Sequence, residues 1–169
     1  MSHASFLYTT DVEPDAKRAD AAAPKRLNRH CNYHIPLLWS ALFGRDDLRM
    51  LPLSGDESGE CWPLLVTRTD AAVERLAQRG HSVEAAFVEA EVSELVAELS
   101  GHLARSGQRF VVLDTFDFGS AAADGAQWRA AMEQVLAAAC DEDWGGYVEL
   151  LPTESWREDG GLMDEYFVG

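Results

Sequence analysis

The 169-residue sequence predicts a single α+β (or mixed α/β) domain, built on a mixed sheet of four to five strands packed with about four helices. Two observations predict this class. Segments with strand composition alternate loosely with helical segments through the middle of the chain, as expected for helices packed on a sheet. The composition, with 47% hydrophobic and 25% charged residues, is that of a globular domain, and a chain of this length buries about two-thirds of its unfolded surface without a disulfide or a metal.

Five short segments are rich in β-branched and aromatic residues and are predicted as strands. They are residues 5–10, 48–53, 61–68, 109–116 and 146–151. The apolar run of 109–116 (RFVVLDTF) is typical of a strand in the middle of a sheet. Pro52 cannot donate a hydrogen bond to a neighbouring strand, so we expect 48–53 at an edge of the sheet.

Helices are predicted from capping residues and from apolar periodicity. Pro36 suits the first turn of a short helix that ends at Gly44, and we expect this helix to be buried because it is apolar on nearly every side. A second helix begins at Thr69 or Asp70 and runs to about Arg79.

The glycine at position 80 is expected to close that second helix. A third helix is predicted to begin near Ser82, because apolar residues recur there at helical spacing. Its stripe consists of Val88, Val92, Leu95, Val96, Leu99 and Leu103. An alanine-rich helix is predicted over residues 125–140.

We expect one domain over residues 1–169, with a mobile loop at about 11–29. That segment contains two prolines, alternating charges and no apolar periodicity. A loop of this length without secondary structure is the part of a domain that is least constrained by packing.

The stretch HCNYH places His30, Cys31 and His34 within five positions and raises the question of a metal or a catalytic pair. Structural zinc needs four ligands, usually as two close pairs, and no second pair is present in the sequence. A Cys31 nucleophile with His34 as its base lacks an indicated third group to orient it. We therefore interpret the stretch as the entry to the Pro36 helix, with Asn32 or His34 as a cap, and we expect no metal and no cofactor.

The charge of the chain excludes some partners and favours others. The sequence has 29 acidic and 14 basic residues, a net charge of −15, and residues 110–169 alone carry thirteen acids against two bases. Nucleic acids and anionic membrane surfaces bind proteins of the opposite sign, so neither is an expected partner. An acidic surface is compatible with a basic protein partner and equally with solubility alone.

Two groups of acids are candidates for contact with such a partner. Glu91, Glu94 and Glu98 recur at helical spacing away from the apolar stripe of the third helix. Asp141, Glu142 and Asp143 follow the last predicted helix directly, where carboxylates oppose the helix dipole.

Large aromatic residues lie close in sequence to the second group: Trp144, Tyr147 and Trp156. Aromatic anchors surrounded by steering charges are typical of protein interfaces, and Trp156 is the anchor that we select. The alternative is that the aromatic residues belong to the core and the acids to solvated loops.

A different kind of site is predicted at the end of the 109–116 strand. Asp114 and Asp117 could act as acid and base or bind a cation there, with His34 as a third member of the pocket. Acids that follow a buried strand also serve as turn formers or helix caps, and this alternative stays open.

Cysteine usage and the first residues predict the compartment. Three scattered cysteines indicate a reducing environment, and the start of the chain lacks the charged and apolar regions of a signal peptide. We expect a cytoplasmic protein.

Three motifs resemble those of a group of small bacterial cytosolic proteins. SFLYTT resembles that group's Ser-Tyr-Leu-Tyr-like strand, NYHIPLLW resembles its Asn-Tyr-x-Ile-Pro helix entry, and FVVLDT resembles its later apolar strand that ends in Leu-Asp. The likeness is weaker in the C-terminal third. It implies a bacterial cytosolic protein and carries no activity over to any residue.

Taken together, the sequence predicts a non-catalytic acidic binding protein, most specifically an immunity-type inhibitor that occludes a basic bacterial toxin or effector domain. The alternative is a small enzyme or metabolite-binding domain that uses Asp114 and Asp117.

Overall fold

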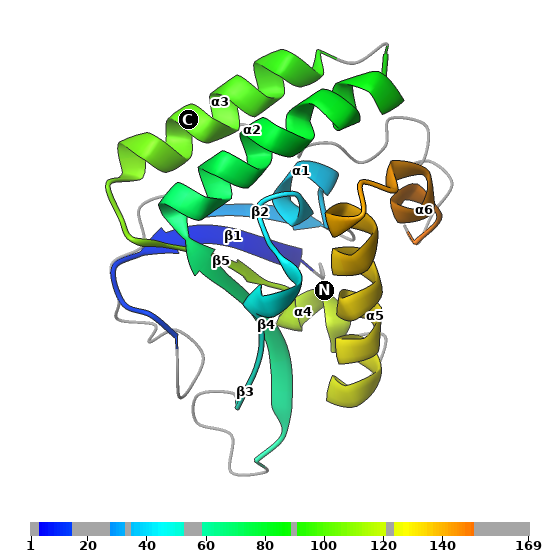
Figure 1. Ribbon diagram of the computed structural model, residues 1–169. Coiled ribbons are helices and arrows are strands. Elements are labelled where there is room, and N and C mark those ends of the chain that lie inside the picture. Colours follow the sequence, from blue (N-terminus) through cyan, green and yellow to red (C-terminus); the bar gives the residue numbers. More distant parts are fainter. Residues whose placement is uncertain are drawn as a thin grey trace.

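The computed structural model describes residues 4–14, 28–32, 35–52, 59–88, 91–120 and 124–150. Within them five strands form one sheet in the order β2-β1-β5-β4-β3, and every neighbouring pair is antiparallel (Figure 1). The strands are β1 (Ala4–Thr10), β2 (Asn28–Asn32), β3 (Leu48–Pro52), β4 (Cys61–Arg68) and β5 (Phe110–Asp114). This confirms the α+β class and the predicted number of strands.

The described helical segments are α1 (Leu37–Ser40), the 3-10 turn η1 (Arg45–Asp47), α2 (Thr69–Ala86), α3 (Val92–Ser106), α4 (Phe116–Gly119), α5 (Gly125–Cys140) and α6 (Trp144–Glu149). In Figure 1, α2 and α3 lie side by side, and α5 and α6 lie together toward the other side of the molecule. The main core forms between these helices and one face of the sheet.

The central position of β5 follows from its composition. Leu113 of β5 is in register with Leu7 of β1 on one side and with Leu65 of β4 on the other, and all three are buried in the main core. The neighbouring Val112 faces the opposite side and joins a second buried cluster. A strand that is buried on both faces needs a continuous apolar run, and the sequence of β5 provides one.

Two further expectations are confirmed. β3 lies at an edge of the sheet, where Pro52 cannot disturb a second neighbour. α1 follows Pro36, and all four of its residues are fully buried. Because α1 is apolar on nearly every side, it lies inside the main core rather than on its surface.

The strand β2 was missed by the sequence interpretation, which placed Asn28 and Arg29 in a loop. β2 (NRHCN) has no apolar alternation, and Cys31 is its only member in the main core. It forms because β1 offers an open edge, where Cys31 pairs with Ser5. Residues 11–14 of the expected loop form neither a helix nor a strand, and residues 15–27 lie outside the described residues.

The boundary between α2 and α3 was also predicted wrongly. α2 continues through Gly80 to Ala86, and the next helix begins at Val92 rather than near Ser82. Gly80 is buried against α3, where an added Cβ would lie only 3.2 Å from Val96 Cγ2. The glycine therefore permits close approach of two helices instead of ending one. Val88 lies between them and is 83% exposed, so it does not belong to the stripe.

The last predicted strand, residues 146–151, is wrong: the described part of this segment belongs to helix α6. The Asp143 side chain accepts a hydrogen bond from the Gly146 amide at 2.9 Å and caps the helix. Trp144 and Tyr147, three residues apart, then face the core together. A cap and an i,i+3 aromatic pair outweigh the strand propensity of the Tyr-Val pair.

The Tyr147 hydroxyl ties α6 to the entry of α1. It donates to the Ile35 carbonyl at 2.8 Å and lies 2.9 Å from Ser40 Oγ, with every partner buried. Burial raises the pKa of Tyr147 well above its usual value. The hydroxyl is thus kept neutral, so it stabilises the fold as a donor and is unsuited to deprotonation near neutral pH.

We expect Tyr147→Phe to lower the free energy of unfolding by about 1–3 kcal/mol, because the Ile35 carbonyl loses its donor inside the core. Ser40→Ala should cost less, since Tyr147 keeps its bond to Ile35. Urea unfolding followed by circular dichroism measures both; an equal loss in the two variants would contradict this order.

The same variant tests the tyrosine pKa. The pKa of Tyr147 is raised in the folded state, so its contribution to the wild-type free energy of unfolding is intact below about pH 10. Above that pH the contribution decreases, by up to about 1.4 kcal/mol per pH unit. Tyr147→Phe lacks this dependence. We therefore expect the difference in the free energy of unfolding between the wild type and Tyr147→Phe to narrow as the pH rises above 10. A difference that stays constant would refute the burial argument.

Candidate functional site

One exposed acidic feature is the α3 ridge, which we define as Glu91, Glu94 and Glu98. All three side chains are exposed, while Val92, Leu99 and Leu103 on the opposite side of α3 are buried. The ridge therefore points away from the core, as the periodicity predicted. Glu98 Oε1 lies 3.4 Å from His102 Nε2, a contact that becomes an ion pair only when the imidazole is protonated.

The position of the ridge explains how the helix tolerates its charges. Glu91 is the residue that precedes α3 and Glu94 lies in its first turn. Negative charge at a helix N-terminus interacts favourably with the helix dipole, typically by about 0.3–1 kcal/mol. This offsets the repulsion of a few tenths of a kcal/mol expected between neighbouring carboxylates. The helix therefore tolerates these neighbouring carboxylates, although the ridge contains no lysine or arginine.

The acids 141–143 form the link between α5 and α6 and have structural roles. Asp141 ends α5, and Glu142 adopts the left-handed conformation with φ 54°. The Asp143 amide then donates back to the Ala138 carbonyl at 2.9 Å, the six-to-one bond of a Schellman motif. Asp143 begins α6 at once by capping Gly146. The three acids thus end α5, reverse the chain and begin α6 within three residues.

The exposed carboxylate of Asp141 also has a partner in the chain. It accepts a hydrogen bond from Arg45 at 2.6 Å, and this contact raises the pKa of Arg45. Both side chains are more than half exposed, at 56% and 64%. Water competes with the pair, so it leaves Asp141 accessible.

The aromatic residues next to this link belong to the core. Trp144 and Tyr147 are 3% and 1% exposed, and Trp144 Nε1 donates to Ser82 Oγ of α2 at 2.9 Å. Neither is available as an interface anchor, so the alternative interpretation of these two residues holds. Trp156, the selected anchor, and His34 lie outside the described residues.

The two acidic groups are on different elements that share one neighbour. α3 packs along α2, and α6 contacts α2 through Trp144 and Ser82. The α3 ridge and the α5–α6 link are therefore both close to α2, but they belong to different elements and do not form one continuous cluster.

Asp114 and Asp117 are engaged with backbone groups. Asp114 Oδ1 accepts from the Phe116 amide at 3.0 Å, which forms the turn into α4. Asp117 Oδ2 accepts from the Ala4 amide at 3.0 Å and holds the start of β1. The Asp114 bond matches the turn-former interpretation, whereas the Asp117 bond joins residues that are 113 positions apart in the sequence.

The strand geometry separates His30 from Cys31. Adjacent residues of β2 point to opposite faces. Cys31 enters the main core, 2% exposed, whereas the ring of His30 lies 6.3 Å from that of Phe6 on the other face. The pair therefore cannot act on one ligand.

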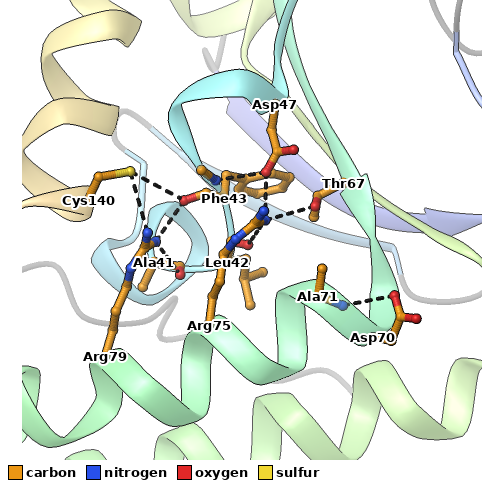
Figure 2. A network of polar contacts seen from close by, with 11 residues as sticks. Ala41, Leu42, Phe43, Asp47, Thr67, Asp70, Ala71, Arg75, Arg79 and Cys140 are labelled. Carbon is orange, nitrogen blue, oxygen red and sulfur yellow. Dashed lines mark hydrogen bonds and ion pairs between the residues drawn. The ribbon is translucent and has the colours of Figure 1, made fainter.

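A feature that the sequence interpretation missed is a pair of arginines on α2, shown in Figure 2. Arg79 Nη1 donates to the carbonyls of Ala41 and Phe43 at 2.8 and 2.7 Å, and its Nη2 lies 3.4 Å from Cys140 Sγ. These carbonyls follow α1, where helix geometry leaves them without intrahelical partners. Arg79 satisfies them and so fixes α1 against α2.

One turn earlier, Arg75 makes a second set of contacts (Figure 2). Its Nη1 donates to Asp47 Oδ2 at 2.7 Å, to Thr67 Oγ1 at 2.9 Å and to the Leu42 carbonyl at 3.3 Å. Asp47 also accepts from the Gly44 amide. Arg75 therefore joins η1, the end of β4 and α2. The i,i+4 spacing of two arginines in an acidic chain was the available signal, but it does not reveal which carbonyls they meet.

Two kinds of feature are absent from the residues that the structure describes. No group of three or more His, Cys, Asp or Glu side chains there is arranged to hold a metal ion. No helix in that part of the chain is both long and apolar enough to cross a membrane. Comparison with protein-family models, with curated proteins and with solved structures finds no significant match.

The role of the α5–α6 link can be tested at Asp143. We expect Asp143→Ala to lower the free energy of unfolding by about 1 kcal/mol through loss of the helix cap. Asp143→Asn keeps a side-chain oxygen for Gly146 and should cost much less. Urea titration distinguishes the two variants, and equal losses would mean that charge rather than capping matters.

The arginine contacts to α1 can be tested with Arg79→Met, which keeps the apolar stem and removes the donors. We expect a loss of about 1–3 kcal/mol, because two carbonyls near the core lose their partner. The control is Arg105→Met in the last turn of α3, an exposed arginine that should tolerate the change. Similar urea midpoints for Arg79→Met and Arg105→Met would show that water replaces the guanidinium at the two carbonyls.

Proposed function

We propose that this protein is a non-catalytic binding protein for a basic protein partner, and more specifically an immunity-type inhibitor that occludes a bacterial toxin or effector domain. The observation that carries the proposal is the α3 ridge, three exposed carboxylates on one side of a helix in a chain of net charge −15. A charged helix face of this kind steers a partner of opposite charge into contact.

The mode of action that we propose is occlusion. Toxin sites that act on phosphates or nucleic acids are cationic, and an acidic helix placed over such a site blocks it both sterically and electrostatically. Within the α5–α6 link, Asp141 and Glu142 are exposed and offer a second acidic group, whereas the Asp143 carboxylate is occupied as a cap. Trp156 remains the proposed aromatic anchor.

Two features support a binding role over a catalytic one. The carboxylates of Asp114 and Asp117 accept backbone hydrogen bonds, and the Tyr147 hydroxyl is buried and fully hydrogen-bonded. An enzyme that uses Asp114 and Asp117 is the alternative, and it requires that their backbone bonds be exchanged for substrate. We also propose a cytoplasmic location, on the cysteine usage, because three scattered cysteines suit a reducing compartment.

The first test is capture of partners from native lysate with the tagged full chain, at low salt and at about 0.5 M salt, where the screening length is only a few Å. We expect a single basic protein that is lost at high salt. If that partner arrests growth when expressed alone, co-expression of this chain should restore growth. A partner that is acidic or salt-resistant contradicts the electrostatic mode.

The ridge is then tested with the triple variant Glu91→Gln, Glu94→Gln and Glu98→Gln. Association with the captured partner should slow by on the order of ten-fold at low salt, because steering depends on these charges. The matched control, Asp46→Asn with Glu74→Gln and Glu133→Gln, removes three exposed acids from η1, α2 and α5. Equal slowing in both variants would assign the effect to net charge and remove α3 from the interface.

A further inference from the structure

We draw no further inference here: the strongest candidate, the pocket at the end of β4 that is lined by Arg49, Arg68 and Arg75, carries none because each of these guanidinium groups is already paired with a carboxylate of the same chain.

Discussion

The structure depends on burying the apolar α1 segment while still supplying donors to the carbonyls that follow it. α1 is only four residues long, so the carbonyls of Ala41, Leu42 and Phe43 cannot be satisfied within the helix. Arg75 and Arg79 reach them from α2. Without these donors the burial of α1 would leave unpaired backbone groups near the core, at a cost comparable to lost hydrogen bonds. The same arginines connect α2 to η1, to β4 and to α5.

The acidic residues divide into those with local structural roles and those without. The link 141–143 looks like a charged patch in sequence, yet its members end one helix, turn the chain and cap the next helix. The α3 ridge has no such role beyond its favourable position at a helix N-terminus. Exposure alone therefore does not distinguish a carboxylate available to a partner from one that connects two helices. The hydrogen-bond partners of each carboxylate make that distinction.

The arginines near the beginning of α2 are paired with carboxylates of the same chain. The α3 ridge lies on the helix packed along one side of α2, while the first turn of α2 borders a pocket at the end of β4 that is lined by Arg49, Arg68 and Arg75. Arg49 is paired with Glu13, Arg68 with Asp70 and Arg75 with Asp47. These arginines therefore add no net positive charge to this part of a strongly negative chain.

Sequence patterns alone predict the α+β class, the central strand β5, the edge strand β3 and the burial of α1, because continuous apolar runs and prolines have few structural solutions. The other features depend on tertiary packing. Gly80 became a contact between helices and Asn28–Asn32 a strand, since each depends on a partner distant in sequence. Residues 144–149 became a helix that combines a local cap with distant contacts of Trp144 to Ser82 and of Tyr147 to Ile35. The ion pairs of Arg49 with Glu13 and of Arg75 with Asp47 arise in the same way. Their members come from segments that are distant in sequence, and no local pattern encodes their convergence.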